Sequence, residues 1–152
     1  MALLKILTYP NPILEKKSVK IANPTAPEIR ELVMDMLETM EANNGLGLAA
    51  PQVGKNVKLC IVKLDGKTYI LINPKIQYKS FSKEVCEEGC LSFPGQFIPV
   101  KRAKKIRVKA QDRDGNKIMI KADGLLARAL QHEIDHLDGI LFIEKKVKIK
   151  KK

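Results

Sequence analysis

The chain has 152 residues, 45% of them hydrophobic and 30% charged, and its net charge is +11. This length suits a single domain, residues 1–152, and no apolar run reaches the roughly 18 residues that cross a membrane. Residues 1–9 do not have the pattern of a signal peptide, and the three cysteines are an odd number, so we expect free thiols in the cytoplasm. The positive charge favours an anionic partner, such as RNA, a ribosome surface or acidic lipid.

The first clear element is an amphipathic helix near residues 26–42. Thr25-Ala26-Pro27-Glu28 has the pattern of a capping box with proline in the first turn. Apolar residues then recur at helical spacing, and Asn43-Asn44-Gly45 is expected to end the helix.

A glycine-rich segment, residues 45–54, follows this helix. It matches the Gly-x-Gly-x-x-Ala pattern of dinucleotide-binding proteins, but that pattern needs a strand before it and a helix after it. Here a helix precedes it, and Pro51 disfavours a helix after it. The small residues suggest instead a backbone that approaches another group closely, with the Gln52 amide available as a hydrogen-bond donor.

Antiparallel strands are expected to fill the middle of the chain. Two hairpins are predicted at Asp65-Gly66 and Asp114-Gly115. Pro74 is expected to interrupt the strands, and a tight loop is expected around Cys90. The predicted strands are 58–64, 69–72, 75–81, 98–100, 105–111 and 117–122.

The last predicted helix, residues 124–138, contains the sequence His132-Glu133-Ile134-Asp135-His136. Asp123 is placed to cap its start, and Gly139 is placed to close it. The two histidines lie one turn apart on a face directed inward and can bind one metal ion. Glu133 then lies near a metal-bound water and can accept its proton.

A third metal ligand is needed, and Cys90 is the candidate for a Cys-His-His site with one position open to water. Two other interpretations stay open. In a closed Cys2His2 site Cys86 would be the fourth ligand, but the gap from Cys90 to His132 is far longer than in a zinc finger and Glu133 has no role. A zincin-type protease also uses His-Glu-x-x-His, but has no use for Cys90.

Three segments together resemble the peptide deformylase family: Gly45-Leu46-Gly47-Leu48-Ala49-Ala50-Pro51-Gln52, Glu88-Gly89-Cys90-Leu91-Ser92, and Gln131-His132-Glu133-Ile134-Asp135-His136. The resemblance covers nearly the whole chain. It implies an α+β fold in which antiparallel strands pack around the C-terminal metal-binding helix. It also implies hydrolysis of the formyl group from the N-terminal formylmethionine of nascent polypeptides, with release of formate.

The resemblance implies one divalent metal ion, usually ferrous iron and otherwise zinc, nickel or cobalt. It places the ligands at Cys90, His132 and His136. Metal-bound hydroxide would attack the formyl carbon, with Glu133 as general base and then acid. The Gln52 amide and the backbone N–H of Leu91 would stabilise the oxyanion. The expected substrate-binding residues are Gly45, Gly47, Glu88, Leu125 and Ala129.

Two residues near the expected site draw attention. Phe97 stands where well-known bacterial members have a basic residue that touches substrate. Arg128, one turn before His132, belongs either at the mouth of the cleft or in a structural salt bridge. In addition, Asp135 is expected to pair with Arg102 and brace the helix.

The C-terminal tail also departs from the family. Long-tailed bacterial members have a C-terminal helix that docks on the ribosome, whereas this chain has a lysine-rich tail, residues 145–152. We expect weak ribosome association through this tail and the basic surface, and neither DNA nor a membrane as partner. A non-catalytic metal-binding or RNA-binding relative is the alternative, but such a protein would not need Glu133.

Overall fold

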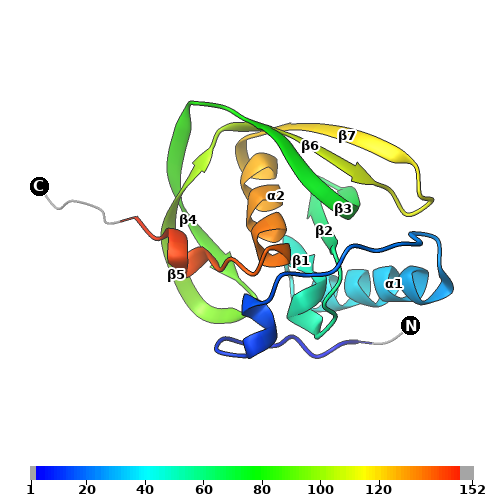
Figure 1. Cartoon of the computed structure of the whole chain (residues 1–152). Coiled ribbons are helices and arrows are strands. Elements are labelled where there is room, and N and C mark those ends of the chain that lie inside the picture. Colours follow the sequence, from blue (N-terminus) through cyan, green and yellow to red (C-terminus); the bar gives the residue numbers. More distant parts are fainter. Residues whose placement is uncertain (1–2, 148–152) are drawn as a thin grey trace, which may run out of the picture.

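The computed structural model describes residues 3–147, and this part of the chain has an α+β fold (Figure 1). None of its helices is long and apolar enough to cross a membrane. Short 3₁₀ helices occupy Pro12–Glu15, Ala50–Val53 and Phe142–Lys145. The main elements are α1 (Pro27–Ala42), β1 (Gly47–Ala49), β2 (Leu59–Leu64), β3 (Lys67–Lys79), β4 (Lys83–Cys90), β5 (Phe93–Ala103), β6 (Lys105–Gln111), β7 (Lys117–Asp123) and α2 (Gly124–Leu137).

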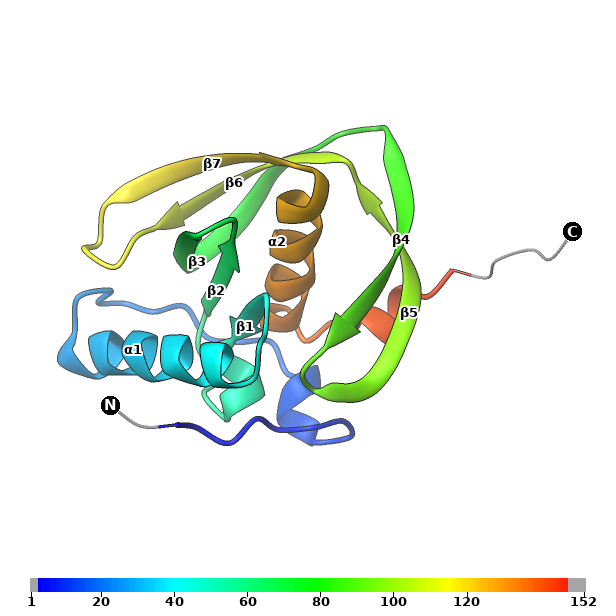
Figure 2. The same ribbon diagram turned by 180° about the vertical axis from the view of Figure 1, so that it is seen from behind.

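The strands form two antiparallel sheets in the described residues. The larger sheet has five strands in the order β1-β2-β3-β6-β7, and β4 pairs with β5 in a separate hairpin. Figures 1 and 2 show α2 between the larger sheet and the β4–β5 hairpin. The expected arrangement, in which antiparallel strands surround the C-terminal helix, is therefore confirmed.

The core forms because each helix buries one apolar stripe. On α2 this stripe includes Ala127, Leu130 and Ile134, which pack with residues of β2, β3, β6 and β7. On α1, Met36 and Met40 are fully buried against β1 and β2. Burying one large apolar side chain contributes about 1.5–3 kcal/mol, so these contacts hold α2 firmly in place.

The strand prediction was wrong at Pro74, because β3 runs through this residue instead of stopping. The pairing of β3 with β6 shifts register between Ile72 and Lys75, which is a bulge. Asn73 has a φ of 52° there, a left-handed conformation that asparagine tolerates. Its side-chain amide donates to the carbonyl of Ile21 and to Gln111, and its Oδ1 accepts from the Ile21 N–H. These bonds hold the bulge in place of regular sheet pairing.

Three further expectations need correction. The capping box is absent, since α1 begins with Ala26 as N-cap and no side chain caps it; Thr25 instead bonds to Asn23. Asp123 is the N-cap of α2, but its side chain makes no capping bond. The segment before Cys90 is a strand, β4, and Cys90 is its last residue.

Candidate metal centre and active site

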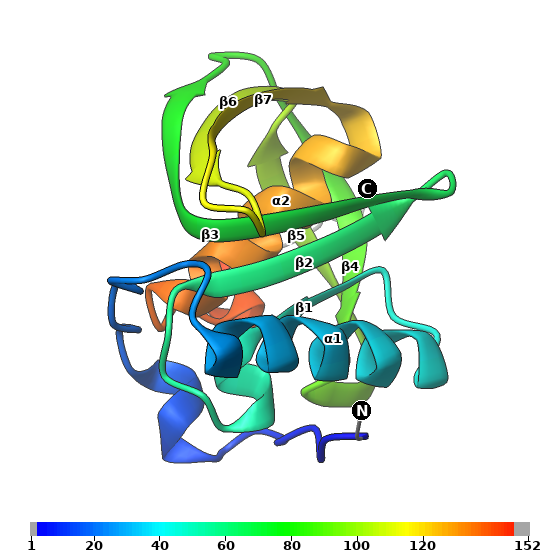
Figure 3. The ribbon, with the colours of Figure 1, turned by 90° about the vertical axis from the view of Figure 1, so that its right-hand side faces the viewer.

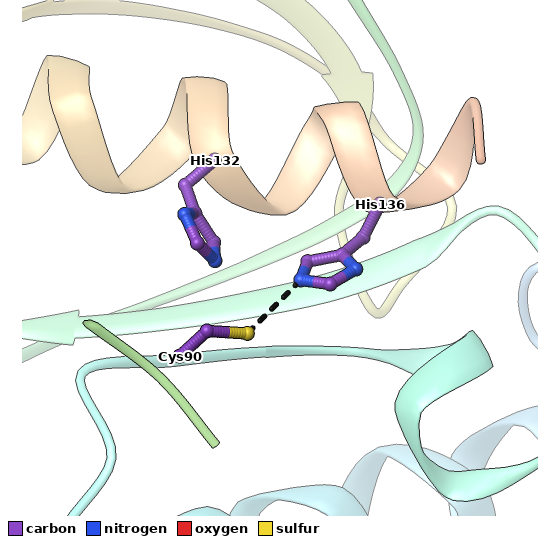
Figure 4. Close-up of side chains that lie close together, drawn as sticks. All are labelled: Cys90, His132 and His136. Atoms are coloured by element: carbon purple, nitrogen blue, oxygen red, sulfur yellow. Dashed lines mark hydrogen bonds between the residues drawn. The ribbon is translucent and has the colours of Figure 1, made fainter. Parts of the chain in front are cut away.

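The two histidines of α2 lie side by side in the core. His132 and His136 are 7% and 1% exposed, and their ring centroids are 5.1 Å apart. Cys90, at the end of β4, places its Sγ 3.3 Å from Nε2 of His136. Figure 4 shows these three side chains converging from the helix and the hairpin. Their ligand atoms all lie within 4.8 Å of one another.

This donor set fits one divalent metal ion. One thiolate and two imidazoles are soft-to-borderline ligands that suit zinc or ferrous iron. Nδ1 of His132 is bonded to Glu88, which leaves Nε2 as its free nitrogen. Cys86 is exposed and does not belong to the cluster. The closed Cys2His2 interpretation is therefore wrong.

Glu88 holds His132 in place from β4. One carboxylate oxygen accepts from Nδ1 of His132 at 2.8 Å and from Nη2 of Arg102 at 2.9 Å. The other accepts from Nε of Arg102 at 2.8 Å and from Nη1 of Arg128 at 2.6 Å. Burial raises the pKa of Glu88, but the hydrogen bonds from Arg102 and His132 outweigh it and lower the pKa to about 2. Glu88 thus stays ionised and fixes the orientation of the His132 ring.

Two arginines tie α2 to the β4–β5 hairpin. Arg102 donates to Asp135 at 2.5 Å, so the expected brace on the helix is confirmed. Arg128 is 5% exposed and donates to Glu88 and to the backbone carbonyls of Glu84 and Val100. It forms a buried structural salt bridge, and the residue also belongs to the lining of the cleft.

Gln52, in the 3₁₀ helix Ala50–Val53, is held by hydrogen bonds at both ends of its amide. Its Oε1 accepts from the N–H of Ala49 at 2.9 Å. Its Nε2 donates to Oγ of Ser92 at 3.1 Å and lies 3.6 Å from Sγ of Cys90. Because the oxygen is held on the far side, the amide N–H₂ group faces Cys90 and can donate into the site.

Glu133 is enclosed next to the cysteine and the two histidines. It is 5% exposed, and its Oε1 has no hydrogen-bond partner among the described residues. Burial raises its pKa to about 7, although the charge of His132 opposes the shift. A Cβ atom added to Gly47 would lie 2.6 Å from its Oε2. The expected close backbone approach of the glycine-rich segment is therefore real, and the group approached is Glu133.

Comparison with known proteins agrees with this geometry. The sequence profile of the family described as polypeptide deformylase matches residues 3–152. Peptide deformylase 1 of Clostridium perfringens is 47% identical over 95% of this chain and 98% of its own length.

The chain belongs to the polypeptide deformylase family. It is accordingly a metallohydrolase that removes N-terminal formyl groups, and the protease interpretation is excluded. The crystal structure of the Thermotoga maritima peptide deformylase superposes with a TM-score of 0.94 at 34% identity, covering 97% of this chain and all of that one. The Ehrlichia chaffeensis peptide deformylase in complex with actinonin has a TM-score of 0.92 at 44% identity, covering 97% of this chain and 91% of that one.

The deformylase site opens into a cleft of about 600 Å³. His132 and Glu133 lie in its lining with all of the residues expected to bind substrate: Gly45, Gly47, Glu88, Leu125 and Ala129. Within this group Glu88 is committed to His132 and the two arginines. Phe97, 70% exposed, stands at the cleft beside Gly89, where an added Cβ would lie 3.0 Å from its ring. The mouth of this deformylase is therefore apolar at that point.

Sequence reasoning missed two supporting residues of the deformylase site. Ser92 was not singled out, although its hydroxyl accepts the hydrogen bond that orients Gln52. Glu88 was assigned only to substrate, although its carboxylate is the partner of His132. Both hydrogen bonds join segments that are about 40 residues apart in the sequence, so no local sequence pattern predicts them.

Proposed function

We propose that this deformylase acts on the N-terminal formylmethionine of nascent polypeptides in the cytoplasm, as one catalytic domain over residues 1–152. We infer ferrous iron as the physiological ion, with zinc, nickel or cobalt as substitutes. The observation that carries the catalytic part of this proposal is the buried, unpartnered Oε1 of Glu133, which lines the same cleft as Cys90, His132 and Gln52. A binding module has no use for such a carboxylate.

The reaction follows from what these side chains can do. A divalent ion held by Cys90, His132 and His136 supplies Lewis acidity and lowers the pKa of water at the site. Glu133 takes a proton from the water that adds to the formyl carbon. The carbon–nitrogen bond then breaks, Glu133 delivers the proton to the departing amine, and formate is released.

The oxyanion needs hydrogen-bond donors on the other side of the cleft. We assign this role to the Gln52 amide and the backbone N–H of Leu91. The bonds from Gln52 to Ser92 and from Ala49 to Gln52 support this, because they fix the amide before substrate arrives. Losing one such donor typically lowers the rate by about 10²–10³.

The proposed function is tested by formate release from formyl-Met-Ala-Ser with protein prepared without oxygen. Glu133→Ala should lower kcat by about 10²–10⁴ and keep its metal, since the three ligands are intact. Glu31→Ala, at an exposed position on α1, is the control and should match the wild type. Equal kcat for Glu133→Ala and wild type would refute the role given to Glu133.

We also infer weak association with the ribosome through the basic surface and the tail, residues 145–152. Residues 148–152 lie outside the described part of the chain. Lys145 is half-buried and pairs with Asp135 at 3.2 Å, so it is already engaged within the protein. The inferred association therefore does not depend on Lys145.

A further inference from the structure

The outer face of β3, β6 and β7 gathers positive charge. Burial alternates along β6 and β7, so that Ile106, Val108 and Ala122 enter the core while the intervening residues are exposed. On β6 and β7 the exposed charged residues are lysines and an arginine, apart from Asp123 at the end of β7. We call the cations the basic sheet face: Lys75, Lys105, Arg107, Lys109, Lys117 and Lys121.

Like charges lie directly opposite each other on this face. Lys75 on β3 is the cross-strand partner of Lys109 on β6, and Arg107 on β6 is the partner of Lys121 on β7. Like charges in such pairs destabilise a sheet. Within residues 3–147 no carboxylate lies within ion-pair distance of any of these cations. Lys105 differs from these pairs, because its cross-strand partner is the carboxylate Asp123. For the two like-charge pairs, a bound polyanion would relieve the repulsion.

A groove of about 790 Å³ adjoins the basic sheet face. Lys105, Arg107 and Lys121 border it, Lys67 adds a fourth cation, and Asp65 and Asp123 are its carboxylates. The Arg107 guanidinium lies 4.9 Å from the ring centre of Tyr78, and the Lys67 ammonium lies 5.0 Å from that of Tyr69. Aromatic rings among cations are the surfaces on which unpaired bases stack.

The groove is a neighbour of the substrate cleft. Leu125, in the first turn of α2, borders both the groove and the cleft that contains His132. Figure 3 shows β3 curving round towards β6 and β7. A polyanion on this face would therefore lie beside the opening through which a peptide enters.

We propose that the basic sheet face and its groove bind RNA. The proposal deepens the inferred ribosome association and rests on it for the choice of RNA as the polyanion. An acidic lipid surface fits less well, because membrane-binding faces add large apolar side chains that insert between lipids. The exposed large apolar side chains of these three strands and the groove are Tyr78, Met119 and Leu125, which are fewer than the six cations of the basic sheet face.

The test compares two triple variants of equal net charge. One is Arg107→Gln/Lys109→Gln/Lys121→Gln, and the control is Lys16→Gln/Lys17→Gln/Lys20→Gln, at exposed positions near the N-terminus. Binding to a fluorescein-labelled single-stranded RNA of about 20 nucleotides is measured across a salt series. The face variant should bind at least tenfold more weakly at low salt, and its slope of log K against log salt should fall by about 2, since each lost phosphate contact contributes about 0.7.

Several outcomes overturn the proposal. Equal losses of RNA affinity in the two triple variants would show that net charge alone determines binding. A loss of RNA affinity on removing residues 148–152, without a loss in the face variant, would assign binding to the tail. Tighter, face-dependent binding to phosphatidylserine vesicles than to RNA would assign the face to a membrane. Thermal unfolding of the face variant should be unchanged or shifted upward, because like-charge pairs are removed; a lower midpoint would indicate a structural role. Formate release from free peptide tests the proposed function separately.

Discussion

The position of the Glu133 carboxylate depends on the absence of a side chain at Gly47, in β1. Glu133 fills the space that a side chain at position 47 would occupy. The contact is with the end of a flexible side chain, so a larger residue at this position would move the carboxylate rather than the backbone. The position of the Glu133 carboxylate is therefore determined by Gly47, a residue that has no side chain.

We expect Gly47→Ala to lower kcat by about 10–100-fold, because small displacements of a reacting group have effects of this size. Metal content and the free energy of unfolding should change little, since the ligands and the core stay in place. Steady-state formate release and metal analysis measure the two effects. Full kcat in the alanine variant would show that Glu133 is not held by this contact.

The three cysteines should differ in reactivity towards a disulfide reagent. Cys86 is exposed and should react at once in the metal-loaded protein, whereas Cys90 should react only after a chelator removes its metal. Cys60 is fully buried; burial, and to a lesser degree the charge of Glu133, raises the pKa of its thiol, so it should react only on unfolding. Thiol counting over time gives these three phases, and a chelator that releases no second thiol would contradict the role of Cys90 as a ligand.

At the scale of elements, α2 is held at its C-terminal end by a close backbone contact. Gly139 has a φ of 73°, and an added Cβ would lie 2.6 Å from the carbonyl oxygen of Glu15. Unlike the contact at Gly47, this one is with backbone and cannot move aside. The end of the metal-binding helix is therefore fixed against the N-terminal segment.

Gly139→Ala should accordingly reduce the free energy of unfolding by more than its left-handed conformation alone explains. Gly66, with a φ of 76° and nothing within 4 Å of an added Cβ, is the matched control. Gly66→Ala should cost about 1–2 kcal/mol, and Gly139→Ala about 1–3 kcal/mol more, as overpacking does. Urea unfolding measures both, and equal losses would show that the contact with Glu15 is unimportant.

Some elements could be predicted from the sequence and others could not. The helices at 26–42 and 124–138 have clear apolar periodicity, and both form within a residue or so of those limits. Strand β4 was missed because most of its residues, from Lys83 to Glu87, are charged or exposed. It is held by pairing with β5, and that pairing leaves no local signal.

At the scale of the whole molecule, the site exists because α2 lies between two sheets that supply different parts. The larger sheet brings Gly47 and the adjoining 3₁₀ helix brings Gln52, while the hairpin brings Glu88 and Cys90. The ligands could be predicted because thiolate and imidazole are scarce and chemically specific. The bonds from Glu88 to Arg102 and Arg128 could not, because charged pairs are common and only the fold selects among them.

The most direct test of the whole account is a titration of metal-free protein with ferrous iron without oxygen, in which formate release from formyl-Met-Ala-Ser is measured at each addition. Activity should rise in proportion to added iron and level off at one ion per chain, and Cys90→Ala should stay near background throughout. Activity that persists in the metal-free chain, or an active Cys90→Ala protein, would contradict the assignment of Cys90, His132 and His136 as the metal centre of a deformylase.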